Sequence, residues 1–488
     1  MATLIKPNDA AWLYVERNEM PAHIGCLAIF SLPENAPEDY LLQMAARFRS
    51  TRIFAPPFNY RLRRGLLHTL LPSWEELEPD QIDLDYHFRH SALPRPGGER
   101  ELGTLISRLH SYRLDRRRPL WEVHLIEGLE NNRFALYTKM HHSQVDGVGG
   151  SRILQSTLSP SPDAGNCSPP WERGLRSQSS AAPRREKPDT MQLLREQAEA
   201  LVPAVQTLLR KPRPEHADET AQPFSAPMTV FNGRIFGKRR FATQHYRLDR
   251  IKRVAKAGGV SVNDVFMALC SGALRRYLGE LGELPAESLT VGMPVSVRPA
   301  GDETVGNAIS FLLAQLHTEI ADPRERLLAC HASAQAGKQP LQDLPKAAIN
   351  NYTMMLMSPQ MLQISLGLGG HTRPMYNLVI SNVPGPSEVL YFNGARMEQV
   401  YPISLLFNGQ ALNITVVSYA GQFNVGFTGC RDSLPSMQKI AVYTGEALEE
   451  LERVFGLAAA PAEASPPIAD KPVKRSPRAK AANGVATA

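Results

Sequence analysis

The alternation of apolar and polar positions predicts a strand that ends in a cluster of reactive side chains. Residues 134–140 (Phe-Ala-Leu-Tyr-Thr-Lys-Met) mix apolar and polar positions with a period of two, which is typical of an extended strand. The strand runs directly into His141 and His142, and Asp146 and Gly147 follow shortly after them. Further glycines break the alternation before a helical pattern begins. The sequence therefore predicts a strand, a tight loop and a short helix after the last of these glycines.

The two adjacent histidines are expected to have different roles. Successive side chains of a strand point to opposite faces, so His142 would share a face with Met140 and Thr138 while His141 faces the other way. An imidazole titrates near neutral pH, and one that faces a reaction centre can act as a general base. We assign that role to one histidine and a packing or hydrogen-bonding role to the other.

Two other interpretations compete for this segment. A metal site needs several donors that converge, but adjacent strand histidines diverge, the nearest other histidine is His124, and no His-Glu-x-x-His spacing occurs. A purely structural interpretation, with two hydrogen-bonded histidines and a turn-forming Asp-Gly, stays open for the segment taken alone. We expect no bound metal.

Helical and strand patterns elsewhere predict an α/β protein. Ser261 and Asp264 have the spacing of a capping box at the start of a long helix, which gives Asp264 a structural role. Asn263, between them, has no such capping role. The other expected elements are helices over about 39–50, 102–112, 189–211 and 435–454, a hairpin over about 121–141, and strands over about 240–248, 289–297, 376–381, 411–420 and 422–429.

Length and cysteine content favour a two-domain protein in a reducing compartment. The chain has 488 residues, of which 43% are hydrophobic and 21% charged, and this is too long for one ordinary core. Five widely separated cysteines with no Cys-x-x-Cys argue against a disulfide framework or a zinc cluster. The N-terminus lacks a signal-peptide pattern, and the uncharged run over 347–370 contains Asn, Gln and Pro, so we expect a cytoplasmic protein without a spanning helix.

The net charge of +6 permits partners with negative charge. No zinc-finger spacing, RNA-binding aromatic signature or long basic helix points to nucleic acid. Anionic lipid head groups, the phosphates of a CoA ester, or simple solvation of surface charge explain the excess. Residues 458–488 are basic and lack apolar periodicity, so they are expected to be disordered and are a candidate membrane tether.

Four motifs in order resemble a known family. His-His-Ser-Gln-Val-Asp-Gly at 141–147 is similar to the active-site signature of the CoA-dependent acyltransferase superfamily. Pro119-Leu120-Trp121 precedes it, and Asn263-Asp264 and Ser381-Asn382-Val383-Pro384-Gly385-Pro386 follow it. In this order and spacing they resemble the bacterial wax ester synthase/diacylglycerol acyltransferase family over about residues 1–455.

The resemblance implies a fold and a reaction. It implies an α/β (α+β) protein of two chloramphenicol-acetyltransferase-like domains, each a mixed sheet with helices, and an active-site channel between them. The implied reaction moves a long-chain acyl group from acyl-CoA to a fatty alcohol or diacylglycerol, with acyl-CoA as substrate and no bound cofactor. Peripheral contact with the inner face of the cell membrane or with lipid inclusions is expected. Nucleic acid is not expected as a partner.

The resemblance also suggests roles for individual residues. His142 would be the general base, in a direct transfer within a ternary complex, and His141 and Gly147 would support it. The segment Val295-Ser-Val-Arg298 with a following Gly-Asn is similar to plant members of the superfamily, in which the arginine pairs with the aspartate of the motif. We therefore expect Asp146 to be a structural anion paired with Arg298, and Asn263 to bind substrate.

The expected organisation has four parts. Residues 1–158 would form the N-terminal domain, 159–235 a crossover linker with one amphipathic helix, 236–457 the C-terminal domain, and 458–488 the tail. Two alternative functions stay open. One is another ester- or amide-forming acyl transfer within the superfamily, such as condensation or polyketide ester formation. The other is a non-catalytic lipid-droplet or membrane-surface protein.

Overall fold

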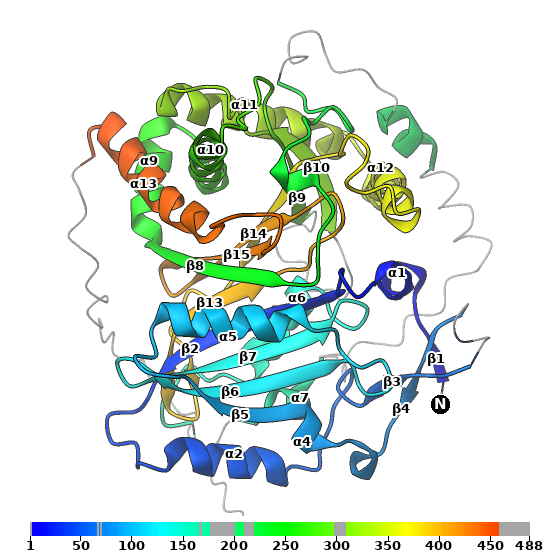
Figure 1. Cartoon of the computed structure of the whole chain (residues 1–488), viewed down its shortest axis with the longest axis vertical. Coiled ribbons are helices and arrows are strands. Elements are labelled where there is room, and N and C mark those ends of the chain that lie inside the picture. The colour runs from blue at the N-terminus through cyan, green and yellow to red at the C-terminus, as the bar shows by residue number, and fades with distance from the viewer. Residues whose placement is uncertain are drawn as a thin grey trace, which may run out of the picture.

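The computed structural model describes residues 2–65, 68, 71–164, 168–175, 201–208, 219–296 and 309–457. It is a mixed α/β structure with two six-stranded sheets, one above the other in Figure 1. Of the expected linker helix, residues 201–208 are described and are helical, and the expected tail lies outside the described residues. Arg298 lies outside them as well.

The first sheet carries the two histidines. Its strand order is β12-β13-β2-β7-β6-β5, with β2 (His23–Ser31), β5 (Phe88–Ala92), β6 (Trp121–Leu129) and β7 (Arg133–His141) from the first half of the chain. The expected hairpin is confirmed, because β6 and β7 pair antiparallel, and β5 adds a parallel edge. The alternation along β7 sends successive side chains into separate apolar clusters, Leu136 and Met140 on one face and Ala135 and Tyr137 on the other.

Helices cover both faces of this sheet. Helix α2 (Tyr40–Ser50) buries Met44 and Phe48 against one face, together with α7 (Pro170–Arg173). Helix α5 (Glu99–Ser111) buries Leu102 and Ile106 against the other face and lies between the two sheets (Figure 1). A small sheet of β1 (Ala2–Leu4), β4 (Ser73–Glu76) and β3 (Tyr60–Leu62) stands beside it, next to helices α1 (Pro7–Val15) and α4 (Leu84–His87).

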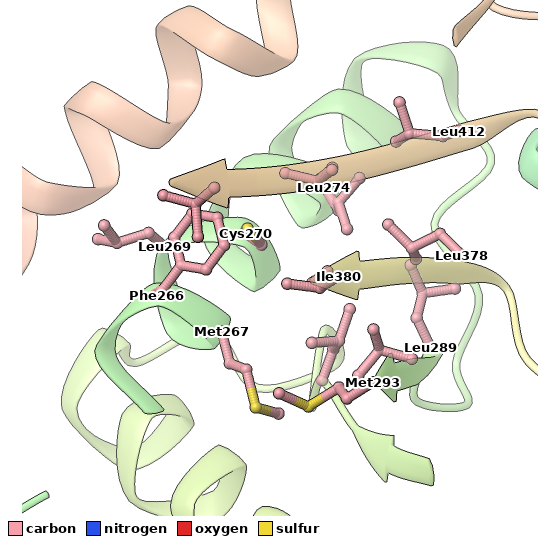
Figure 2. Close-up of a cluster of buried hydrophobic side chains, with 14 of the residues drawn as sticks. Phe266, Met267, Leu269, Cys270, Leu274, Leu289, Met293, Leu378, Ile380 and Leu412 are labelled. Atoms are coloured by element: carbon pink, nitrogen blue, oxygen red, sulfur yellow. The ribbon is translucent and has the colours of Figure 1, made fainter. Parts of the chain in front are cut away.

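The second sheet is built from the second half of the chain. Its order is β10-β9-β11-β14-β15-β8, with β10 (Ile309–Gln315), β9 (Thr290–Ser296), β11 (Leu378–Pro384), β14 (Leu412–Tyr419), β15 (Gln422–Cys430) and β8 (Arg239–Arg247). Helices α9 (Leu248–Gly258), α10 (Val262–Leu281), α11 (Pro323–Gln342) and α13 (Gln438–Val454) lie on one side of it (Figure 1). Helix α10 is the centre of the core, where Phe266 and Leu274 project toward Ile380 and Leu412 of the sheet (Figure 2).

The two halves are joined by an exchanged strand and by serine hydrogen bonds. Strands β12 (Tyr391–Phe392) and β13 (Ala395–Ile403) come from the second half, yet β13 pairs with β2 of the first sheet. The edge strand β8 donates from the amides of Arg239 and Phe241 to the hydroxyls of Ser111 and Ser107 on α5, at 2.9 Å each. The sequence-based boundaries stay a prediction, and they did not include this exchange.

Among the described residues, no single helix is long and apolar enough to cross a membrane. Helices α9 and α10 together meet that length and composition, but they are bent by 98° at the break between them.

Candidate active site

Hydrogen bonds from both neighbouring segments fix the main chain at the end of β7. The amide of His141 donates to the carbonyl of Leu120 at 3.0 Å, and the amide of His142 donates to the carbonyl of Ala22 at 2.9 Å. Leu120 belongs to the Pro-Leu-Trp motif, and Ala22 precedes β2. The two histidines are therefore clamped between strands on either side, although β7 itself ends at His141.

His141 is completely buried, and its hydrogen bonds define its tautomer. Its Nδ1 accepts from the amide of Ser143 at 3.1 Å and lies 2.7 Å from the Ser143 hydroxyl. An acceptor nitrogen carries no proton, so in the neutral ring the proton resides on Nε2. Nε2 faces Oε1 of Glu16 at 3.7 Å, which is too long for a hydrogen bond. Burial lowers the pKa of His141, although Glu16 opposes that shift, and the neutral ring is a scaffold for the loop.

Glu16 is the buried acid of the site, and sequence analysis missed it. Its carboxylate accepts from the Ala22 amide at 3.1 Å and from Nε of Arg116 at 2.9 Å, and Arg113 lies 3.6 Å away. Burial opposes ionisation, but His141, Arg116 and the Ala22 amide outweigh it and lower the pKa of Glu16 to about 2. The residue links α1, the segment before β2 and the basic segment before β6. No local pattern marks it in the sequence, because these partners come from distant segments.

His142 lies half-buried against an aromatic pair. Its ring centroid is 4.2 Å from that of Trp12 on α1, with a tilt of 31° between the planes. Trp12 in turn stacks on Phe407, at 5.7 Å, from the loop between β13 and β14. Burial lowers the pKa of His142 to about 4, against the opposing charge of Asp146. Among the described residues, no other side chain hydrogen-bonds to its ring nitrogens, so the neutral ring can accept a proton from a bound molecule.

Asp146 caps the helix that follows the histidines. Helix α6 (Gly147–Ser156) begins at Gly147, so the expectation that glycines separate the loop from the helix is wrong. The Asp146 carboxylate accepts from the amide of Gly149 at 2.7 Å, and this pairing starts the helix within the glycine run. The expected partner Arg298 lies outside the described residues, and the ion pair stays a prediction. A Cβ at Gly147 would meet nothing within 4 Å, so this position borders open space.

The structure brings together two later motifs that are distant in sequence. Nδ2 of Asn382, near the end of β11, donates to Oδ1 of Asn263, in the first turn of α10, at 2.5 Å. Asn263 is exposed, and this bond leaves its own amide hydrogens directed elsewhere. Asp264 beside it is fully buried, forms the expected capping box with Ser261, and lies 2.7 Å from Nδ1 of His331. The structural assignment of Asp264 is confirmed.

The site residues fall into two groups. His142 lies with Trp12 and Phe407, where the first half of the chain meets the second, and Asp146 follows it at the start of α6. The asparagine pair lies on the second half, and no hydrogen bond within the described ranges joins it to His142. Trp121 of the Pro-Leu-Trp motif is a buried core residue whose indole donates to the Phe58 carbonyl at 2.8 Å. Within the described residues, no group of three or more His, Cys, Asp or Glu side chains could hold a metal ion.

Comparisons with known proteins agree with this architecture. Residues 5–266 match the model of the wax ester synthase/diacylglycerol acyltransferase catalytic domain, and residues 305–452 match that of the WS/DGAT C-terminal domain. A protein of Acinetobacter baylyi named O-acyltransferase WSD is 40% identical, over 92% of this chain and 97% of its own length. The solved wax ester synthase/diacylglycerol acyltransferase of Marinobacter aquaeolei VT8 is 38% identical, with a TM-score of 0.75 over 93% of this chain and all of its own.

A more distant match concerns the fold alone. The first condensation domain of the calcium-dependent antibiotic synthetase is 15% identical and superimposes with a TM-score of 0.55, over 93% of this chain and 96% of that domain. The two-sheet arrangement is therefore shared with proteins of little sequence similarity.

Proposed function

Because the chain belongs to the wax ester synthase/diacylglycerol acyltransferase family and is an O-acyltransferase, we propose that it moves a long-chain acyl group from acyl-CoA to a fatty alcohol or diacylglycerol. The products would be a wax ester or a triacylglycerol and free CoA. The observation that carries the proposal is His142, a neutral imidazole at the junction of the two halves whose ring nitrogens no other side chain among the described residues occupies.

In the proposed reaction, His142 removes the proton from the acceptor hydroxyl as its oxygen attacks the thioester carbonyl. A carbon–oxygen bond forms, the carbon–sulfur bond breaks, and the proton held by His142 passes to the departing CoA thiolate. The oxygen that becomes negatively charged needs hydrogen-bond donors. Asn263 is our candidate for substrate binding, since its Oδ1 is occupied by Asn382 and its amide hydrogens can donate.

Direct transfer is favoured over a covalent acyl-enzyme. Burial raises the pKa of Cys26 and Cys330 to about 12, so these thiols stay protonated and are poor nucleophiles. Glu16, His141 and Ser143 do align as an acid, a histidine and a serine. However, Ser143 is only 4% exposed and His141 is fully buried, so a bound thioester has no access to the hydroxyl. Ser143→Ala should therefore keep most of the turnover, whereas an acyl-enzyme route would lose it entirely.

The experiment is an assay of purified protein with labelled palmitoyl-CoA and a panel of acceptors. Hexadecanol and a diacylglycerol test the two proposed acceptors, and a carrier-protein thioester tests a condensation-type donor. Labelled ester from free acyl-CoA, absent with His142→Ala, is the expected result. Transfer only from the carrier-bound donor would overturn the proposal, and absence of transfer to any acceptor would favour a non-catalytic lipid-surface role.

We also propose that the protein works in the cytoplasm at the inner face of the cell membrane or on lipid inclusions. Fatty alcohols and diacylglycerols partition into lipid, so an enzyme that uses them benefits from peripheral attachment. The basic sequence of residues 458–488 supports an electrostatic contribution. Deletion of these residues should weaken binding to anionic vesicles at low salt and leave turnover of detergent-dispersed substrates unchanged. Unaltered vesicle binding would remove the tail from the proposal.

A further inference from the structure

Helix α12 (Lys346–Ser365) buries an apolar face, as an ordinary surface helix does, but it also leaves large apolar side chains exposed on its outer face. Asn351 and Gln360 are each 7% exposed, whereas Met354 is 49% exposed and Leu362 is 59% exposed. An ordinary surface helix buries its apolar stripe and exposes its polar one. The helix lies at one side of the second half, apart from α9, α10 and α13 (Figure 1). Its outer face is therefore suited to an apolar neighbour.

Three exposed leucines gather where α12 ends. Leu362, Leu366 and Leu368 are 59%, 63% and 43% exposed. The helix closes in a Schellman-type turn, in which Gly367 has φ +72° and the amide of Leu368 donates to the Gln363 carbonyl at 2.9 Å. The turn follows Leu366 directly and precedes Leu368, and we name the three exposed leucines at this helix end the leucine tip. A group of exposed apolar side chains often marks a contact surface, whereas single exposed apolar residues are common on any protein.

A cationic strip borders the leucine tip. Gly370 packs directly on the neighbouring segment, since a Cβ there would lie 2.7 Å from the amide nitrogen of Arg234. From Arg234 the chain alternates, so that Arg234, Phe236 and Lys238 are exposed while Ile235 between them is buried. Phe236 is 53% exposed. The sequence from 347 to 372 contains no acidic or basic residue apart from one histidine. Apolar and cationic side chains thus share this surface.

A series of close contacts connects the segment of the leucine tip with His142, the proposed base. A Cβ at Gly369 would lie 2.4 Å from the carbonyl oxygen of Asn408, so glycine is required for this approach. Asn408 follows Phe407, which stacks on Trp12, and Trp12 packs on His142. The surface and the candidate active site therefore share one loop.

We infer that the leucine tip and the strip of Arg234, Phe236 and Lys238 form the surface by which the protein contacts an anionic lipid layer. The inference rests on the proposed function, because lipid-borne substrates give such a contact its purpose. Leucine and phenylalanine side chains enter the acyl-chain boundary, and the two cations lie against anionic head groups. A second copy of this chain is less favoured as the occupant, since the cations of the strip would face the same cations of a symmetric partner.

The experiment measures partition of the full-length protein onto phosphatidylcholine vesicles with and without phosphatidylglycerol. The test variant is Leu362→Ser/Leu366→Ser/Leu368→Ser. The matched control is Leu4→Ser/Leu42→Ser/Ile53→Ser, which changes three residues that are 70%, 60% and 60% exposed in the first half. Partition of the test variant should fall by about tenfold or more, because three side chains lose their apolar burial. The control should bind like the unchanged protein.

A charge variant and an activity readout complete the test. Arg234→Ala/Lys238→Ala should lose the preference for vesicles that contain phosphatidylglycerol. All variants should turn over detergent-dispersed palmitoyl-CoA and hexadecanol at the unchanged rate, which shows that they fold. Equal vesicle binding by the test variant, or equal loss in the control, would overturn the inference. The inference would also be overturned if the unchanged protein formed a dimer and the test variant were a monomer. If no variant makes ester, the proposed function fails, and the vesicle result still decides where lipid binds.

Discussion

His141 and His142 are adjacent in the chain but occupy opposite environments. His141 is fully buried, with Nδ1 held by Ser143 and Nε2 facing Glu16. His142 is half-buried and stacks on Trp12, and no other side chain among the described residues hydrogen-bonds to its ring. Burial lowers the pKa of both rings, so both are neutral near pH 7. What separates them is access as well as hydrogen bonding, because the ring of His141 is fully buried and bonded to Ser143, whereas that of His142 is partly exposed to a bound molecule.

The difference shows how the local structure gives His141 a supporting role and leaves His142 as the candidate base. Strand alternation turns the side chains apart, and the polar network around Glu16 fills one side while aromatic packing covers the other. A buried polar network holds its members in one geometry, whereas an aromatic face fixes a ring without occupying its nitrogens. Substitutions on the two sides should therefore change different measured quantities.

The largest effect is expected for His142→Ala. Removal of a general base typically costs roughly 10²- to 10⁴-fold in rate, and esterification should fall at least this far. The melting temperature should change little, since the ring makes no described hydrogen bond to another side chain. The measurement is turnover of labelled palmitoyl-CoA together with thermal unfolding. Turnover near that of the unchanged protein would remove His142 from its proposed role.

Glu16→Gln should mainly lower stability. Removing one partner of a buried ion pair leaves the other uncompensated, and a cost of about 3 kcal/mol in the free energy of unfolding is expected, at the low end because Arg116 is partly exposed. Denaturant unfolding measures this cost. His141→Ala, on the same network, should lose stability more than proton transfer. A His141 variant that melts like the unchanged protein but loses as much activity as His142→Ala would reverse the two roles.

The same network predicts how stability depends on pH. The pKa of Glu16, at about 2, lies below its ordinary value of 4.5, so ionised Glu16 stabilises the fold above about pH 4.5, and this contribution is lost as pH falls toward 2. The lowered pKa of His141 acts in the same direction, with stability lost as pH falls below 6.5. The Glu16→Gln variant should therefore show a weaker loss of stability between pH 4.5 and 2.

Much of the fold and part of the site follow from local patterns. Alternation along residues 134–140 predicts the separate faces of the two histidines, and the capping box at Ser261 and Asp264 predicts the start of α10. Both depend on neighbours within one element, so a single stretch of sequence contains the whole signal. The motif order also predicted the family.

Long-range partners had no comparable signal. Trp12 and Phe407 meet His142 only after α1 and the loop between β13 and β14 pack together, and neither has a local pattern that marks it. The Asn263–Asn382 bond and the β13–β2 pairing likewise join distant segments. Side-chain pairing across a tertiary junction depends on how whole elements pack, and local periodicity contains no information about it.

A smaller effect is expected at Asp146, where two substitutions distinguish the helix-capping role of the side chain from the role of its negative charge. Asparagine caps helices about as well as aspartate, so Asp146→Asn keeps the bond to the Gly149 amide but removes the charge. Asp146→Ala removes both, and loss of the cap alone should cost about 0.5–2 kcal/mol in unfolding free energy. If Asp146 pairs with Arg298, Asp146→Asn should lose stability and activity together. An Asn variant with unchanged melting temperature but reduced activity would instead indicate a catalytic aspartate.

The smallest change at neutral pH is expected for Trp12, which contacts His142 only through its ring face. Trp12→Ala should admit water to His142, and its pKa should rise from about 4 toward its ordinary 6.5. Because the base must be unprotonated, kcat/KM of the unchanged protein should be flat above about pH 5, whereas the variant should lose on the order of tenfold at pH 5 and little at pH 8. Trp12→Phe keeps an aromatic face and should stay close to the original profile. If both variants lose activity equally at every pH, the indole supports the structure alone, and the distinction between a hydrogen-bonded histidine and an aromatic-shielded one no longer explains which of them is the base.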